Sequence, residues 1–434
     1  MKKFLALILA LVMALSLVAC GGNSGAQGEG DGDAATGSVY YLNFKPEAEE
    51  AWQALAKTYT DQTGVPVKVV TAASGEYETM LVSEMDKDGA PTLFQCNEGG
   101  VATWGDFCYD LSDSAVYNEL ASKDYALKNA DGEVISIAYC LETYGIIVNK
   151  ALLEQAGHSL NEITDFDSLK AVADDIHARA GELGFDAFTS AGLDGSSSWR
   201  FSGHLSNMPL FYEFRDDGVS SKPATIKGTY LDNYKQIWDL YITDSATTGA
   251  ALLTATGDQA EAEFGEGKAV FYQNGTWEYS NLTEKFGMNP DDLTMIPIYC
   301  GVEGEEKAGL CTGTENYWSV NKNAKEEDIK ATLDFLYWVV TSEEGTTMMA
   351  EQFGACPFNS SKAPSNPFSA LANEYVANGC YPVTWAFNYT PAVNDWRAAV
   401  VDALSKYTAG DGSWDDVKTA FVEGWATQYA NENA

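Results

Sequence analysis

Thiols and imidazoles are the most reactive side chains in this sequence, and their spacing limits the chemistry they can do. Besides Cys20 there are seven cysteines, at positions 96, 108, 140, 300, 311, 356 and 380. Cys300 and Cys311 flank a Gly- and Glu-rich stretch that predicts a hairpin turn, so they are the best-placed disulfide pair. Buried free thiols are the alternative for the other cysteines. There is no CxxC pair, and the wide spacing of the three histidines argues against a zinc site: His158, His177 and His204.

Carboxylates are the most numerous ionisable groups, with 63 Asp and Glu residues against 26 Lys and Arg and a formal net charge of −37. A surface this acidic repels nucleic acid and anionic lipid head groups, so neither is an expected partner. With so many acids, carboxylate pairs like that of a glycan hydrolase would occur by chance, so such a pair is no evidence for an enzyme. No GxSxG, HExxH or P-loop pattern occurs. We therefore expect that the protein is not an enzyme and has no cofactor. The alternative from a different functional class is a cell-surface glycan hydrolase.

The first twenty residues predict export. A positive start is followed by about 15 apolar residues, fewer than the roughly 20 that span a membrane, so 1–19 is expected to be a cleaved signal peptide. Leu17-Val18-Ala19-Cys20 resembles the lipobox of bacterial lipoproteins, which implies a lipid on Cys20. A plain secretory signal with a coincidental cysteine is the alternative. The Gly-rich residues 20–37 then form a flexible tether.

This resemblance places the chain on the outer face of the cell membrane. No second apolar stretch approaches membrane length, so the expected protein is anchored through lipid and not embedded. The acidic composition favours a Gram-positive surface, and the periplasmic side is the alternative in a Gram-negative cell.

From residue 39 the chain alternates short β-like runs with helical patterns, which predicts an α/β fold. The expected order is a strand at 39–44, a helix from Pro46 to Gly64, a strand at 65–71, a helix at 76–88 and a strand at 91–96. Parallel strands joined in this way place their ligand loops at one sheet edge. Phe44, Asn97 and Glu98 are expected near that edge.

The remaining chain continues the pattern and is long enough for two or three lobes, with 45% hydrophobic and 12% aromatic residues to build their cores. Strand-like runs are expected at 134–140 and 145–148, and helices at 150–156, 167–180, 231–241 and 326–340. The last hundred residues are mainly helical in pattern, and no internal repeat is visible.

Four segments in order along the chain resemble the sugar-binding lipoproteins of ABC importers, the extracellular solute-binding family 1 that includes maltose-binding protein. Residues 137–153 are similar to the family's first crossover strand and its Asn-Lys, and 262–277 to its Phe-x-x-Gly-x-Ala and Gly-x-Trp patterns. Residues 316–324 resemble the family's third crossover, and 391–397 with 410–414 resemble its C-terminal helices. One departure is Gly89-Ala90-Pro91-Thr92-Leu93, where the family often has Gly-x-Pro-Asp-Val.

The resemblance implies a two-lobed fold of the type II periplasmic-binding-protein kind. Each lobe is a β-sheet flanked by helices, and three crossover segments near 140–144, 268–274 and 313–318 form a hinge. The expected N-terminal lobe is 38–141 plus 272–316, and the expected C-terminal lobe is 142–271 plus 317–434. Such a protein closes its lobes on a ligand that contacts both of them.

The same resemblance implies ligand-binding residues in the cleft. A sugar offers apolar faces to aromatic rings and hydroxyls to acids and amides, and the chain has 11 Trp and 23 Tyr. Glu142, Trp277 and Trp396 match the family's cleft carboxylate and its two aromatic positions. Less direct candidates are Trp199 and Arg200 in the second lobe, and Asn97, Glu98, Trp318, Trp385 and Asn388. Ordinary packing is the alternative for each of these residues.

The partners implied by the resemblance are a carbohydrate, expected to be an oligosaccharide, and the membrane permease subunits of the importer. The binding protein itself is expected to be a monomer. A different solute, such as a polyamine or a peptide, is the alternative within the binding class. No metal site is expected.

Overall fold

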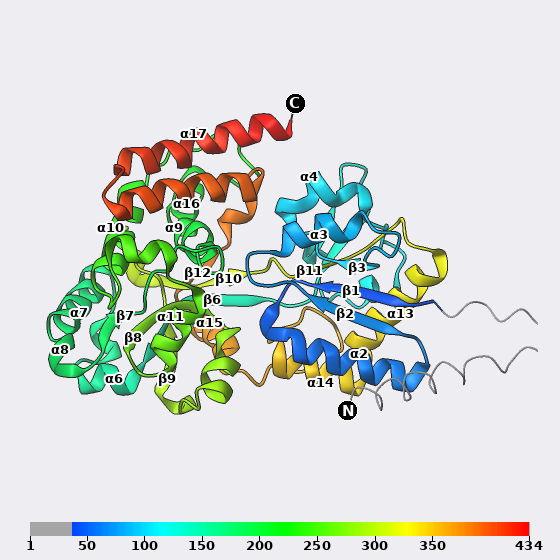
Figure 1. Ribbon diagram of the computed structural model, residues 1–434, viewed down its shortest axis with the longest axis horizontal. Helices are drawn as coiled ribbons and strands as arrows, with labels where there is room; N and C mark the ends of the chain where they lie inside the picture. The colour runs from blue at the N-terminus through cyan, green and yellow to red at the C-terminus, as the bar shows by residue number, and fades with distance from the viewer. Residues whose placement is uncertain (1–36, 434) are drawn as a thin grey trace, which may run out of the picture. The chain divides into compact units, whose positions relative to one another are not determined.

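The computed structural model describes residues 37–433, which form two β-sheets, each flanked by helices (Figure 1). The expected signal peptide, Cys20 and the tether up to residue 36 lie outside the described residues. The first sheet has six strands in the order β2 (Val67–Thr71), β1 (Val39–Asn43), β3 (Leu93–Phe94), β11 (Tyr317–Val320), β5 (Val134–Ala138) and β4 (Ala126–Lys128). Strands β1, β2 and β3 are parallel, as predicted, whereas β11 runs antiparallel between β3 and β5.

The second sheet is built around β6 (Glu142–Asn149), all of whose residues are buried. Its order is β12 (Tyr381–Thr384), β10 (Ala308–Gly313), β6, β8 (Ala269–Gly275) and β7 (Asp186–Phe188), and β9 (Leu293–Ile296) also pairs with β6. Strands β8, β9 and β10 all run antiparallel to β6. The two sheets with their helices confirm the predicted two-lobed α/β fold.

The helices of the first lobe include the three predicted at 46–64, 76–88 and 326–340. They are α2 (Glu49–Thr63), α3 (Tyr77–Met85), α4 (Val101–Trp104), α5 (Ala115–Asn118), α13 (Glu326–Thr341) and α14 (Glu343–Gln352). Trp52, Leu55 and Tyr59 of α2 are buried, which confirms the inward face expected for that helix. Gly64 ends α2 in the left-handed conformation, at φ 77°, which glycine adopts without strain.

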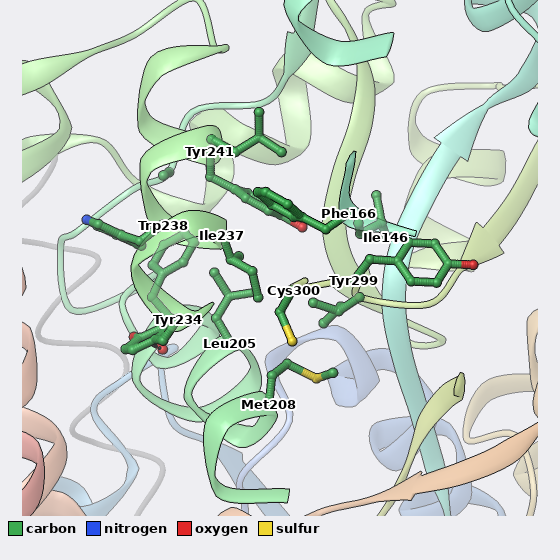
Figure 2. Close-up of a cluster of buried hydrophobic side chains, with 14 of the residues drawn as sticks. Ile146, Phe166, Leu205, Met208, Tyr234, Ile237, Trp238, Tyr241, Tyr299 and Cys300 are labelled. Atoms are coloured by element: carbon green, nitrogen blue, oxygen red, sulfur yellow. Dashed lines mark hydrogen bonds between the residues drawn. The ribbon is translucent and has the colours of Figure 1, made fainter. Parts of the chain in front are cut away.

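Helices of the second lobe are more numerous and include two π-helical turns. They are α6 (Lys150–Gln155), α7 (Phe166–Ala178), α8 (Ala180–Leu183), η6 (Arg200–Leu205), α9 (Ser206–Asp217), α10 (Leu231–Thr243), α11 (Gly257–Gly265), α12 (Glu278–Ser280), η8 (Asn281–Lys285), α15 (Phe368–Ala377), α16 (Val393–Ala409) and α17 (Trp414–Glu432). Figure 2 shows part of their core, in which Tyr234, Ile237 and Trp238 of α10 lie beside Leu205 and Met208. These side chains are at most 1% exposed, so the core holds this lobe as a rigid unit.

Three segments cross between the lobes. Residues 139–141 join β5 to β6, residues 314–316 join β10 to β11, and the third crossing lies between α14 and α15. Asn366 anchors the end of the third crossing in the second lobe, where its amide Nδ2 donates to the carbonyl oxygen of Thr276 at 2.7 Å. The crossings expected near 140–144 and 313–318 are therefore present.

The prediction of a crossing at 268–274 is wrong, and the predicted lobe boundaries that depend on it are wrong as well. This segment is β8, a strand that pairs with β6 and β7 inside the second sheet. Residues 272–316, expected in the first lobe, contribute β9 and β10 to the second sheet, whereas β11 and α13, expected in the second lobe, pack with the first. An apolar run that ends at a glycine describes a buried inner strand as well as a hinge strand, so the pattern could not separate the two.

The predicted disulfide between Cys300 and Cys311 is also wrong, because both thiols are free and buried. The turn between them is held instead by Glu305. Its carboxylate accepts hydrogen bonds from the backbone N–H groups of Cys300 at 2.6 Å and Gly301 at 2.8 Å. Cys311 Sγ lies 3.8 Å from the sulfur of Met208. The other five cysteines within 37–433 are free as well.

The described part of the chain contains neither a helix able to span a membrane nor a cluster of metal ligands. None of its helices combines the length and the apolar character needed to cross a bilayer. Nor do three or more metal-ligating side chains gather at one point within residues 37–433.

Candidate functional site

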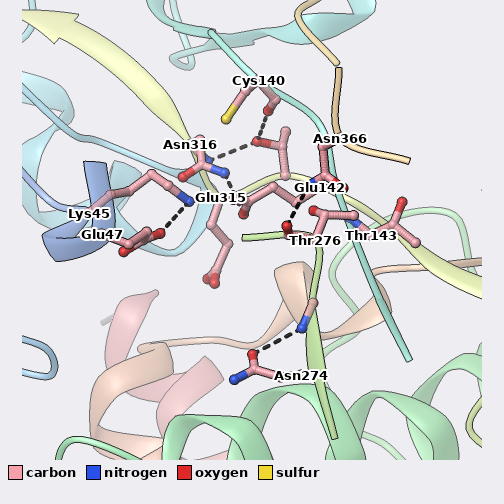
Figure 3. Close-up of polar contacts among 12 residues, drawn as sticks. Lys45, Glu47, Cys140, Glu142, Thr143, Asn274, Thr276, Glu315, Asn316 and Asn366 are labelled. Atoms are coloured by element: carbon pink, nitrogen blue, oxygen red, sulfur yellow. Dashed lines mark hydrogen bonds and ion pairs between the residues drawn. The ribbon is translucent and has the colours of Figure 1, made fainter. Parts of the chain in front are cut away.

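A polar group lies where the crossings leave the first lobe, and we call it the hinge cluster: the buried residues Lys45, Glu142 and Asn316, with the more exposed Glu47 (Figure 3). Lys45 is 5% exposed and forms ion pairs with Glu142 and, at 2.9 Å, with Glu47. The amide Nδ2 of Asn316 donates to the second carboxylate oxygen of Glu142 at 2.7 Å. Lys45 precedes α2, Glu142 begins β6 directly after the first crossing, and Asn316 belongs to the second crossing, so the cluster ties the first lobe to the hinge.

Electrostatics keep Lys45 charged in this setting. Burial alone would lower the pKa of its ammonium group, but the Glu142 and Glu47 carboxylates raise that pKa above its usual value. Lys45 is therefore charged at neutral pH. Its raised pKa stabilises the folded protein at every pH below the usual lysine pKa, and this stabilisation is lost as the pH rises above that value.

Five aromatic rings lie next to the hinge cluster, and we call them the aromatic cluster: Tyr144, Trp199, His204, Trp277 and Trp385. His204 is central, with its ring stacked on Tyr144 at 3.8 Å and its centroid 5.5 Å from Trp277 and 5.0 Å from Trp199. The rings of Trp199 and Trp277 are 6.1 Å apart and both are partly exposed. Two neighbouring indoles that keep some exposure provide flat apolar faces for a ligand.

Local sequence explains how Trp277 reaches this position. Strand β8 ends at Gly275, where a Cβ atom would lie 2.2 Å from the indole ring of Trp277, so only glycine lets the ring fold back over the strand end. The ammonium nitrogen of Lys45 then lies 5.8 Å from the Trp277 ring centroid. A residue of the first lobe and an aromatic ring of the second therefore meet at this point.

Two ionisable groups beside these rings are held uncharged near neutral pH. Burial, followed by the positive charges of Arg397 and Arg200, lowers the pKa of His204 well below its usual value. Burial, followed by the charge of Glu261, raises the pKa of Glu278 to about 8, and its Oε2 atom has no hydrogen-bond partner within the described residues. A neutral acid and a neutral imidazole can each donate and accept hydrogen bonds.

A second polar group joins the first lobe, a crossing and the second lobe. The side-chain amide of Gln95 donates to the backbone oxygen of Glu315 at 2.7 Å, and an Nη2–Oε1 distance of 3.5 Å pairs Arg397 with the Glu315 carboxylate. Gln95 Oε1, Asn316 Oδ1 and Arg397 Nε are buried without a partner among residues 37–433. Each such atom costs roughly 1–3 kcal/mol, which a polar ligand could recover.

The lobes touch at two rims on either side of these groups. At one rim the Ser74 hydroxyl donates to the carbonyl oxygen of Ser196 at 3.2 Å, and a Cβ atom at Gly75 would lie 2.4 Å from the carbonyl oxygen of Gly195. At the other rim a Cβ atom at Gly99 would lie 2.6 Å from a methyl group of Val393. The lobes are therefore closed over the two polar groups and the aromatic cluster.

Comparison with known proteins identifies the family of this protein. A model of bacterial extracellular solute-binding proteins matches residues 54–377. The chain belongs to this family. Its members bind substrates and are not enzymes, as the sequence predicted. A search among curated proteins finds no match for this solute-binding protein.

Solved structures agree on the fold. The binding protein RafE in complex with raffinose has a TM-score of 0.69 at 18% identity, over 88% of this chain and 98% of that one. The GacH receptor of Streptomyces glaucescens, solved with acarbose, has a TM-score of 0.67 at 18% identity, over 91% and 99% of the two chains. A sugar transporter protein from Bacillus licheniformis in complex with stachyose has 0.68 at 17% identity, over 90% and 100%.

Four of the predicted site residues lie together in this solute-binding protein. Trp277, Trp199 and Trp385 belong to the aromatic cluster, and Glu142 belongs to the hinge cluster. Asn388 lies next to the hinge, where its amide donates to the carbonyl oxygen of Thr314 at 3.2 Å. The side chain of Asn97 caps the 3-10 helix η2 (Glu98–Gly100), which touches the second lobe through Gly99.

Three predicted residues lie in lobe cores instead. Trp396 is fully buried against Phe421 and Trp425, and its indole N–H donates to the carbonyl oxygen of Phe421 at 2.9 Å. Trp318 is fully buried in the first lobe, and Arg200, at 2% exposed, bonds the backbone oxygen of Gln273. For these three residues the structure shows ordinary packing, which was the alternative to ligand binding.

Sequence reasoning missed several residues of the site: Lys45, Gln95, Tyr144, His204, Glu315 and Arg397. Lys45 directly follows Phe44, which was expected at the ligand edge, so its place at a strand end was a usable signal. Arg397 ends the segment 391–397, and it pairs with Glu315 at the lobe boundary. No sequence signal marks His204, because a π-helical turn carries it inward.

Proposed function

We propose that this solute-binding protein captures an oligosaccharide between its lobes and delivers it to the membrane subunits of an ABC importer. The observation that carries the proposal is the pair of partly exposed indoles, Trp199 and Trp277, beside buried polar groups contributed by both lobes. Sugar rings stack on indoles, and their hydroxyls can pair with the unpartnered oxygen and nitrogen atoms. The sugars bound by the three similar structures support the same ligand class.

The proposal includes an anchor and a monomeric state. A lipid on Cys20, followed by the Gly-rich tether, would hold the monomer close to its permease on the outer face of the membrane. Labelled palmitate that is incorporated into the wild type and not into Cys20→Ser would support this anchor, whereas equal labelling of the two proteins would contradict it.

A thermal-unfolding screen tests the ligand class. The panel contains neutral oligosaccharides such as raffinose, stachyose and cello-oligosaccharides, a linear polyamine and short peptides. A ligand at one hundred times its Kd adds about 2.7 kcal/mol to the free energy of unfolding, so a binder should raise the melting temperature clearly. Stabilisation by the polyamine or the peptides alone would contradict the sugar assignment.

Closure itself can be tested at Gly75. We expect Gly75→Ala to lower the affinity for a stabilising oligosaccharide at least fivefold, because the new Cβ atom meets the Gly195 carbonyl only when the lobes close. Gly64→Ala is the matched control, since Gly64 has nearly the same φ, 77° against 81°, and open space around its Cβ position. Isothermal titration calorimetry on both variants provides the measurement. Wild-type affinity in Gly75→Ala would mean that ligand binding does not require this contact.

A further inference from the structure

A pocket of about 320 Å³ opens between the lobes beside Trp385. Glu98, at the start of η2, is the residue that the first lobe contributes to it. The second lobe contributes aromatic walls from α9 and from the 3-10 helix η11 (Ala386–Tyr389) with the residue before it: Phe211, Phe214, Trp385 and Tyr389. A carboxyl group of the first lobe therefore faces four aromatic side chains of the second lobe, with Arg215, Thr384 and Asn388 as further polar residues of the lining.

Glu98 has no ion-pair or hydrogen-bonding partner for its carboxyl group in the described chain, and the cations near it are engaged elsewhere. Arg215 also lines the pocket, but its guanidinium Nε bonds Asp216 at 2.8 Å. The ammonium group of Lys222 pairs with Glu432 at 2.9 Å. Burial, followed by the charge of Glu315, raises the pKa of Glu98 to about 7. The charged form of a desolvated carboxyl group without a partner is strongly stabilised by a cation on a bound ligand.

We propose that this pocket takes a protonated amino group of the ligand, with the ammonium group against Glu98 and the carbon skeleton against the aromatic walls. Aromatic surfaces attract ammonium groups as well as apolar carbon, so both parts of the pocket favour the same chemistry. The proposal rests on the oligosaccharide function above and narrows it to sugars that carry an amine.

Hydroxyl groups of the same sugar unit would find partners close by. Trp385 is 7% exposed, and its indole N–H has no hydrogen-bond partner within residues 37–433. The amide oxygen of Asn388 also lacks a hydrogen-bond partner there. One donor and one acceptor next to a carboxylate suit an amino sugar better than a simple amine, because a sugar hydroxyl can pair with each. A neutral sugar would leave the charge of Glu98 uncompensated.

The charge of Glu98 sets a pH dependence for this binding. The ionisable groups that face it are Glu315 on the second crossing, Tyr317 in β11, Tyr389 in η11, Lys222 before α10 and Arg215 in α9. Below about pH 7 the free protein holds Glu98 neutral, and an ammonium group loses its partner. The affinity for the protonated form of an amine-bearing sugar, corrected for the fraction of ligand amine that is protonated at each pH, should therefore fall about tenfold between pH 7.5 and pH 5.5, while that for a neutral sugar stays nearly constant.

Calorimetry on the full chain with matched ligands tests the assignment. The ligands are β-1,4-linked glucosamine oligomers, their N-acetylated counterparts, cello-oligosaccharides of equal length, and spermidine as an amine without a sugar ring. At pH 7.5 we expect the glucosamine oligomer to bind at least tenfold more tightly than the two neutral oligomers, and Glu98→Gln to remove that difference. Glu154→Gln, which changes an exposed carboxylate in the second lobe, should leave it intact.

Each outcome separates this inference from the proposed function. Equal affinities for glucosamine and neutral oligomers, or an equal loss for all of them in Glu98→Gln, would overturn the amine pocket and leave the sugar function standing. Binding of spermidine alone, lost in Glu98→Gln, would overturn the amino-sugar assignment together with the sugar function. A wild-type pH profile that stays flat for the glucosamine oligomer after correction for protonation of the ligand amine would overturn the role of Glu98 even if Glu98→Gln failed to fold.

Discussion

Replacement of Trp277 by alanine is expected to weaken oligosaccharide binding more than tenfold and to leave unfolding of the ligand-free protein little changed. An indole that stacks on a sugar can bury up to about 150–250 Å², worth several kcal/mol at about 25 cal/mol per Å², and a tenfold loss needs only about 1.4 kcal/mol. The ring is partly exposed and lies over a glycine, so its removal opens little of the core. Calorimetric titration and thermal unfolding of the same preparation measure both quantities.

Trp338→Ala is the matched control for this substitution. Trp338 is also a partly exposed tryptophan, but it lies on α13 in the first lobe, where its indole N–H donates to Gln62 at 3.1 Å. We expect Trp338→Ala to bind the oligosaccharide as tightly as the wild type. If Trp277→Ala did so as well, Trp277 would have no place in the binding site.

A large effect on stability is expected from Lys45→Met. The substitution removes the buried partner of Glu142 and leaves that carboxylate with the amide of Asn316 as its remaining donor. Breaking a buried ion pair from one side typically costs 3–5 kcal/mol, so we expect the free energy of unfolding to fall by about 3 kcal/mol. Chemical denaturation, with the slope checked against the wild type, measures the change.

A double variant and a surface control define this result. In Lys45→Met/Glu142→Leu no charge is left unpaired between the two positions, so most of the lost stability should return. Lys57→Met breaks an exposed pair with Asp61, whose side chains are 75% and 62% exposed, and should change the free energy of unfolding by less than about 1 kcal/mol. If Lys45→Met behaved like Lys57→Met, the hinge cluster would not be a stabilising element.

Much of the fold was predictable because its elements carry strong local signals. Helix α2 shows an apolar face at helical spacing and ends at a glycine, and β1 is a short run of buried apolar residues, so both were expected from their own residues. The lobe boundaries depend instead on which strands pair. Strand β8 and a hinge strand have the same apolar pattern, and only the pairing of β8 with β6 and β7 shows to which lobe it belongs.

The site was predictable in part for a related reason. Trp277 and Trp396 are both tryptophans at positions that resemble the family, but Trp277 follows a strand end and stays partly exposed, whereas Trp396 faces inward from α16 between Phe421 and Trp425. A helix face is decided by its neighbours, which a single residue does not reveal. Lys45 was missed because its role depends on Glu142, 97 residues further along the chain.

The contact at the Gly75 rim has a consequence for the time that a ligand stays bound. The carbonyl oxygen of Ser196 accepts from the Ser74 hydroxyl of the opposite lobe and also from the indole N–H of Trp199 at 2.9 Å. One exposed neutral hydrogen bond contributes only about 0.5–1.5 kcal/mol, too little to keep the lobes shut alone. In the function that we propose, a sugar bound between the lobes would therefore supply most of the free energy of closure. A permease subunit that separated this rim would also displace the Trp199 indole, on which we propose that the sugar stacks.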